Sequence, residues 1–151
     1  MESKQAYKAL FAIMLVTMLS VAGIALPYPI LAPLFLDPVL NSLNHFNGIE
    51  GKLLLAFVLS AYPFGMLIGS SFVGTLSDHY GRKKTLLATG LFSCMGYGLS
   101  AYAIFSLNFP LLFLARFFTG LFEGNIAIGQ AIATDLHPVI DKTRSLSLIH
   151  I

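Results

Sequence analysis

The chain has 151 residues, of which 56% are hydrophobic and only 11% are charged, and its formal net charge is +2. Because a typical soluble domain is about 25% charged, this composition excludes a disordered segment, argues against an ordinary soluble domain and indicates a membrane protein. The weak and scattered positive charge excludes a nucleic-acid footprint, and the single cysteine, Cys94, excludes an intrachain disulfide and a zinc cluster of cysteines.

The first apolar stretch predicts a membrane-spanning helix over about 7–34. No charged side chain occurs between Ala9 and Leu36, and this run exceeds the roughly 20 residues that a helix needs to cross a bilayer. The run is too long for the core of a signal peptide, so we expect an uncleaved first helix. Prolines near its end favour kinks, and these are Pro27, Pro29 and Pro33.

Two further charge-free stretches run from Leu53 to Ser77 and from Thr85 to Ala115. They predict second and third spans over about 53–76 and 85–105. The apolar residues are continuous rather than alternating, and a lipid-exposed backbone must satisfy its own hydrogen bonds. We therefore expect helices rather than strands, and a further kink at Pro63.

Small residues in the second and fourth spans predict close helix packing. Gly65 and Gly69 have the GxxxG spacing, and Gly120 and Gly124 repeat it. Glycine allows helix backbones to approach one another in lipid, where no hydrophobic force favours association.

The fourth span, predicted over about 110–135, differs from the others because it contains Arg116 and Glu123. Ionisable groups inside a span are costly and are candidate functional residues. At about 100° per residue, Arg116, Glu123 and Gln130 share one helix face, with Thr119 at its edge. Arg116 and Glu123 are about 10 Å apart along the axis, too far for an easy direct pair. This polar stripe predicts a helix that lines a transport cavity, the alternative being a polar seam between helices.

The distribution of basic residues predicts the orientation of the chain. Only Lys52 lies on one side of the four-span arrangement, whereas the other side carries Lys4, Lys8, Arg82, Lys83, Lys84, Lys142 and Arg144. By the positive-inside rule, the loop 77–84 and the tail 136–151 are cytoplasmic, and the segments 37–51 and 106–110 face outward. We expect a multi-pass protein of the inner or plasma membrane with a cytoplasmic N-terminus.

The loop between the second and third spans has an unusual charge pattern. Its sequence is Gly74-Thr-Leu-Ser-Asp78-His-Tyr-Gly81-Arg82-Lys83-Lys84. Asp78 lies at the C-terminal end of one helix, where the helix dipole is already negative, and the basic triplet begins the next helix, where the dipole is already positive. We therefore expect these charged side chains to have partners elsewhere. Gly81 suits a tight turn with a positive φ. The pattern G-x-x-x-D-x-x-G-R-K-x after the second span resembles the signature loop of the major facilitator superfamily.

Other segments extend this resemblance over about 10–148. The end of span 1, Gly23-Ile-Ala-Leu-Pro27-Tyr-Pro29, is similar to that of drug–proton antiporters of the superfamily. The sequence Arg116-Phe-Phe-Thr-Gly120-Leu-Phe-Glu-Gly124-Asn125 resembles the span-4 motif of the family, and Ala133-Thr-Asp135-Leu-His-Pro138 resembles the loop towards span 5. The chain departs from the family pattern at Ser20, where many antiporters have aspartate, and at Thr119, where glutamine is common.

The resemblance implies an all-α polytopic protein in which residues 1–151 form the first part of an N-terminal six-helix bundle. Because family members normally have twelve spans, we expect a fragment of a longer carrier. The implied activity is secondary transport of a small solute, by rocking of two halves around a midplane site. The antiporter likeness further implies proton-coupled efflux of small amphipathic compounds, driven by a proton gradient without a bound cofactor.

The resemblance also implies roles for two groups of residues. A gating role is implied for Gly74, Asp78, Gly81, Arg82, Lys83 and Asp135, with Arg82 expected to reach Asp135. We expect a second group to line the cavity and to bind substrate or proton, namely Arg116, Thr119, Gly120, Glu123 and Gln130. The expected partners are the lipid bilayer, a small-molecule substrate and the remaining spans of the carrier, and no nucleic acid.

Two alternatives stay open at the level of sequence. One is a complete four-span multidrug exporter that works as a dimer, although such proteins carry their membrane glutamate in the first span and lack the Gly74–Lys84 pattern. The other is a membrane protein that binds a larger partner without transporting. The sequence contains no phosphate loop, catalytic triad or metal-ligand spacing, so we do not expect an enzyme.

Overall fold

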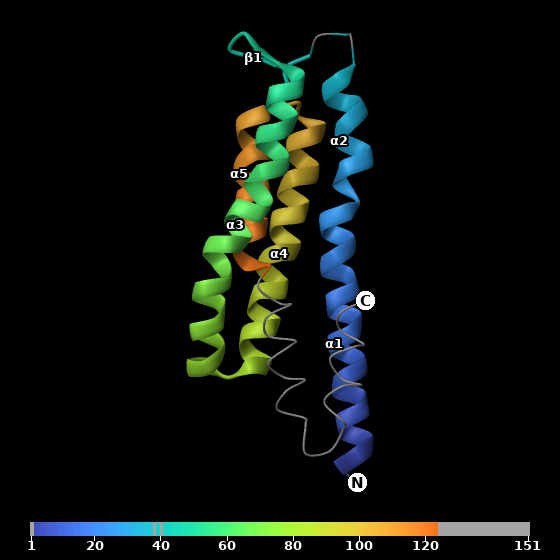
Figure 1. Ribbon diagram of the computed structural model, residues 1–151, viewed down its shortest axis with the longest axis vertical. Helices are drawn as coiled ribbons and strands as arrows, with labels where there is room; N and C mark the ends of the chain where they lie inside the picture. The colour runs from blue at the N-terminus through green and yellow to red at the C-terminus, as the bar shows by residue number, and fades with distance from the viewer. Residues whose placement is uncertain (1, 38, 40, 124–151) are drawn as a thin grey trace.

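The computed structural model describes residues 2–37, 39 and 41–123, which form an elongated bundle of helices (Figure 1). In chain order the elements are α1 Glu2–Ala25, α2 Pro27–Leu36, β1 His45–Phe46, β2 Ile49–Glu50, α3 Gly51–Tyr80, α4 Arg82–Phe105 and α5 Phe109–Phe122. The predicted all-α class is confirmed, and the two strands form only a short antiparallel hairpin outside the helices.

Among the described residues, three helical segments are long and apolar enough to cross a membrane. They are Met14–Leu36, Gly51–Tyr80 and Arg82–Phe105, and they match the first three predicted spans. The fourth, α5, has 14 residues in this part of the chain. The remainder of the predicted span, residues 124–135, lies outside the described residues.

The first span is interrupted at its first proline but remains helical. The Leu26 N–H still donates to the Ala22 carbonyl at 2.8 Å, and Leu26 has helical dihedral angles. Pro27 has no N–H to donate, so the hydrogen-bond ladder breaks there and α2 begins. The helices continue through the other predicted kink sites, α2 through Pro33 and α3 through Pro63.

The predicted loop 77–84 is wrong as a loop, because nearly all of it is helical. α3 continues to Tyr80 and α4 begins at Arg82, leaving only Gly81 between them. Gly81 has φ +90° and ψ 141°, and its N–H donates to the Ser77 carbonyl at 3.1 Å. The end of an apolar run marks the edge of the lipid, whereas backbone hydrogen bonding carries the helix on into polar sequence.

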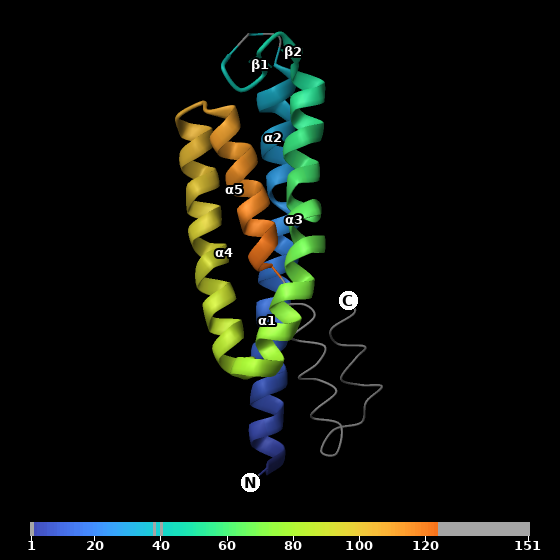
Figure 2. The ribbon, with the colours of Figure 1, turned by 90° about the vertical axis from the view of Figure 1, so that its left-hand side faces the viewer.

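The helices run up and down between two ends of the bundle. The N-terminus of α1 and the α3–α4 turn lie at one end, and the hairpin and the α4–α5 turn lie at the other (Figures 1 and 2). α5 packs extensively against both α3 and α4, and α2 packs against α3. This alternation is the one that the predicted spans require, while the direction of the bundle in the membrane stays a prediction.

Small residues bring α3 and α5 into close contact, which confirms the packing prediction for these helices. A Cβ atom at Gly65 would meet the backbone carbonyl of Phe117, and one at Gly120 would meet the backbone carbonyl of Tyr62. A Cβ atom at Gly69 would likewise meet the backbone of the facing helix. The two backbones therefore touch without intervening side chains.

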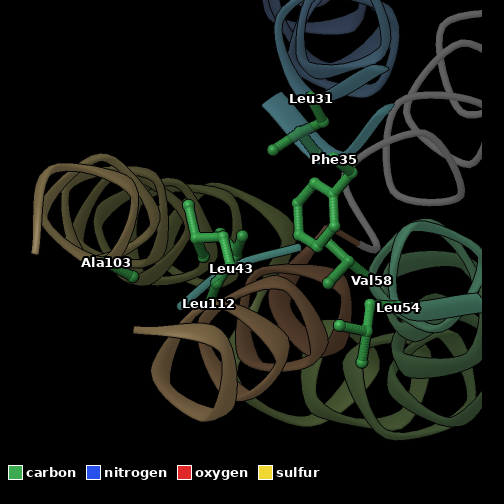
Figure 3. Packing of buried hydrophobic residues seen from close by; sticks show 7 residues of the cluster. All are labelled: Leu31, Phe35, Leu43, Leu54, Val58, Ala103 and Leu112. Carbon is green, nitrogen blue, oxygen red and sulfur yellow. The ribbon is translucent and has the colours of Figure 1, made fainter. Parts of the chain in front are cut away.

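The cluster of buried apolar residues whose packing is shown in Figure 3 lies towards the hairpin end of the bundle, near the ends of the helices that meet there. It draws side chains from four helices and from the loop after α2, namely Leu31, Phe35, Leu43, Leu54, Val58, Ala103 and Leu112. Each of these side chains is at most 2% exposed. The cluster closes this end of the bundle and leaves the polar side chains nearer its middle.

Two asparagines fix the loop that contributes Leu43 to this cluster. The Asn44 Nδ2 donates to the carbonyl oxygens of Val39 at 2.8 Å and Asp37 at 3.1 Å. The Asn41 Oδ1 accepts from the backbone N–H groups of Leu43 and Asn44, each at 2.9 Å. These bonds satisfy loop backbone groups that burial would otherwise leave unpaired.

Candidate functional site: a buried charged pocket

Two ionisable side chains, one in α5 and one directly after it, lie in the interior of the bundle. Arg116 and Glu123 are each 2% exposed, and Glu123 is the C-cap residue that follows the end of α5 at Phe122. A buried charge without compensation costs several kcal/mol, about 3–5 when one partner of a buried pair is removed. The surroundings of both groups therefore decide what this site can bind.

Arg116 lies against the ring of Tyr62 from α3. Its Cζ atom is 4.7 Å from the ring centroid, a cation–π contact worth about 2 kcal/mol when desolvated. Within the described residues, the Nε and Nη1 atoms of Arg116 have no hydrogen-bond partner. Arg116 also lines a cavity of about 190 Å³ against α2 and α4. Arg116 thus borders open space, while these two donors stay buried and unpaired.

Glu123 lines a second and larger cavity, of about 520 Å³, between α1 and α4. The polar residues around it are Ser20, Ser93 and Tyr97, whose hydroxyl groups lie close to the carboxylate. Among the described residues, however, Glu123 Oε2 and the hydroxyls of Ser93 and Tyr97 make no well-aligned hydrogen bond. The rest of the wall is formed by Val16, Ala22, Gly23, Leu26, Pro27, Gly90 and Cys94.

Tyr97 stands between the two cavities. It lines both of them, as do Leu26 and Pro27 at the junction of α1 and α2. A Cβ atom at Gly23 would collide with the Tyr97 hydroxyl and lie 2.5 Å from its Cζ atom. Only glycine at that position allows the ring to lie where it does.

No ion pair joins Arg116 to Glu123 in the part of the chain that the structure describes. The separation expected from seven residues along a helix agrees with this arrangement. Each group faces its own cavity, Arg116 the smaller and Glu123 the larger. The structure therefore brings both predicted residues inside and aims them at different spaces.

Thr119 and Gly120, also predicted for the cavity, make packing contacts. The Thr119 hydroxyl donates to the Ala115 carbonyl of its own helix at 2.7 Å and lies against Gly96 of α4. Gly120 meets the backbone of α3. Neither residue lines the two cavities beside Arg116 and Glu123.

The sequence reasoning missed Tyr62, Tyr97 and Ser93, because it searched the spans for charged side chains. The available signal was the presence of phenol and hydroxyl groups inside otherwise apolar spans. A buried tyrosine hydroxyl normally has a hydrogen-bond partner. Within the described residues, the Tyr62 and Tyr97 hydroxyls have no hydrogen-bond partner of good geometry.

The described gating residues, Gly74 to Lys83, lie at or near the α3–α4 turn. Arg82 Nη1 lies 3.8 Å from the Asp78 carboxylate, and the Asp78 side chain is 74% exposed, so this pair contributes little stability. A Cβ atom at Gly74 would meet nothing within 4 Å, and Lys83 is exposed. Their gating role stays a prediction. Several predicted positions lie outside the described residues, namely Gly124, Asn125, Gln130, Asp135 and the tail 136–151.

Comparison with known proteins places the chain in a family. The family model of the Major Facilitator Superfamily matches residues 9–151. The chain belongs to the Major Facilitator Superfamily. This membership confirms the resemblance seen in the sequence, and because the family consists of transporters, this facilitator chain is not an enzyme.

Individual relatives of this facilitator chain include the class H tetracycline resistance protein of Pasteurella multocida. It is 31% identical over 138 residues, which are 91% of this chain and 32% of the relative. Facilitated glucose transporter member 5 of Bos taurus, of solute carrier family 2, is 35% identical over 81 residues, which are 54% of this chain and 16% of the transporter. The chain thus spans a third or less of the length of these relatives. No solved structure matches it.

Proposed function

We propose that this chain forms the first spans of a secondary transporter that exports small amphipathic compounds in exchange for protons. The larger cavity supports this proposal. Its volume is about 520 Å³, and its mainly apolar wall with one carboxylate suits an amphipathic ligand. A relative whose match covers 91% of the chain is named for resistance to tetracycline, and this favours export of a drug-like compound.

The observation that carries the proposal is the position of Glu123. This carboxylate is 2% exposed, lines the larger cavity, and forms no ion pair among the described residues. Ser20 lines the same cavity. Ser20 occupies the position of the span-1 aspartate of many antiporters, and Glu123, at the end of α5, supplies a carboxylate to the same space. We propose that Glu123 binds the coupling proton there.

The test uses a carrier that contains this chain, reconstituted into liposomes. Glu123→Gln is expected to abolish uptake driven by a pH gradient, while exchange at saturating substrate without a gradient survives, because exchange moves no net protons. Glu50→Gln is the matched control, since Glu50 is an exposed carboxylate in the hairpin. Unchanged gradient-driven transport in Glu123→Gln would contradict the proton role, and loss of exchange even at saturating substrate would indicate a structural role.

The orientation and the remaining partners belong to the same proposal. The N-terminus of α1 and the α3–α4 turn share one end of the bundle, so the basic residues at both can face the cytoplasm together. We propose an inner or plasma membrane location with this end inside. The signature loop would then act as a cytoplasmic gate against the later spans, with Arg82 and Asp135 as partners.

A further inference from the structure

We propose that the ligand of this site is a dipolar molecule, with a cationic group bound by Glu123 and an anionic group bound by Arg116. The inference rests on the proposed transport function and names the class of substrate that the same site takes. The apolar body of the molecule lies between the two charges, next to Tyr97.

The first support is a pair of opposite buried charges with unused bonding capacity. Glu123 Oε2 and Arg116 Nε and Nη1 have no hydrogen-bond partner among the described residues, although both side chains are 98% buried. These atoms are shielded from solvent, but each side chain lines a cavity, so a ligand in that space lies against the charged residue.

The second support is that the two cavities adjoin. Leu26, Pro27 and Tyr97 line both of them, so a ligand that passes Tyr97 reaches both charged groups. The Tyr97 hydroxyl also lacks a well-aligned partner in the described part of the chain and can bond the middle of such a ligand. The surrounding walls are largely apolar and suit a hydrocarbon or aromatic body.

Ligands with a single charge satisfy this arrangement less well. A simple organic cation would neutralise Glu123 and leave Arg116 buried and unpaired, and a simple anion would do the reverse. A dipolar ligand pairs both groups and carries no net charge into a low-dielectric interior. The buried polar groups of the site therefore discriminate against analogues that lack one end.

Three probes with one skeleton test the inference, namely 4-(aminomethyl)benzoate, 4-methylbenzylamine and 4-methylbenzoate. The first carries both charges at opposite ends of a ring, and each of the others keeps only one. Their affinities are measured by titration calorimetry on the detergent-purified carrier that contains this chain, without any gradient. The dipolar probe is expected to bind at least about tenfold more tightly than either analogue, because each lost charge leaves a buried partner unsatisfied.

Substitutions then assign each end of the probe. Glu123→Gln should lower the affinity for the dipolar probe to that for 4-methylbenzoate, and Arg116→Gln should lower it to that for 4-methylbenzylamine. Glu123→Asp and Arg116→Lys keep the charges and should retain the preference for the dipolar probe, which guards against a folding defect. Equal affinities for all three probes or the absence of saturable binding would overturn the inference. So would an equal loss of affinity for both single-charge analogues in each variant.

The failure of this inference is distinguishable from failure of the transport proposal. Proton-driven export of cations without any preference for the dipolar probe would refute only the inference that the ligand is dipolar. Selective binding of the dipolar probe without gradient-driven movement of any of the probes would refute the transport proposal alone.

Discussion

The contact between α3 and α5 predicts a specific destabilisation by one added methyl group. In Gly120→Ala the new Cβ atom would lie 3.0 Å from the Met66 backbone nitrogen and 3.1 Å from the Tyr62 carbonyl carbon, and still closer to the Tyr62 oxygen. These are backbone atoms of α3, which cannot rotate away as a side chain can. The two helices must therefore separate, and Gly65 loses its close contact as well.

The size of the effect follows from two opposing terms. Overpacking a well-packed contact costs about 1–3 kcal/mol, and a backbone clash belongs to the upper end of that range. Replacing a helical glycine by alanine stabilises the helix by about 1 kcal/mol. We expect Gly120→Ala to lower the free energy of unfolding by about 2 kcal/mol, the difference between these terms.

Gly98→Ala in α4 is the matched control, because a Cβ atom there meets nothing within 4 Å. It gains only the helix-propensity term, so it should stabilise the protein by up to about 1 kcal/mol. Unfolding of the purified protein in mixed micelles, followed by far-ultraviolet circular dichroism, measures both variants. Gly120→Ala with a stability equal to or above that of Gly98→Ala would refute the reasoning.

Three more predictions concern the turns and the orientation. Gly81→Ala should cost about 1–3 kcal/mol in the same titration, because φ +90° with ψ 141° is a glycine conformation. Asn44→Ala should cost about 2 kcal/mol and accelerate amide hydrogen exchange in the loop before the hairpin, because carbonyl groups lose their donors. In a Cys94→Ser background, a cysteine at Asn47 should react with an impermeant maleimide in intact cells and one at His79 only after permeabilisation. The reverse labelling would overturn the orientation.

The sequence determined most of the fold because the signals for it are local. The lengths of the charge-free runs located three helical segments that can span a membrane. The positive φ of Gly81 and the close approach at Gly65 also followed from residue type and spacing. The hairpin was missed, although Asn47 and Gly48, both with positive φ, carry the Asn-Gly signal of a two-residue turn.

The candidate site could be predicted only in part, because a helical wheel shows which residues share a face and not what that face meets. The wheel placed Arg116 and Glu123 together, and both are buried. It also placed Thr119 at the edge of that face, where the structure shows it packed on Gly96.

Only the tertiary structure decided that Arg116 meets Tyr62 and that the two charges face separate cavities beside Tyr97. These facts depend on the rotation of each helix about its axis and on the distances between helices. Both are set by contacts between residues far apart in the chain, such as Gly65 with α5 and Gly23 with Tyr97. The hydrophobic pattern of a single span carries no record of those contacts, because lipid and a neighbouring helix are equally apolar surroundings.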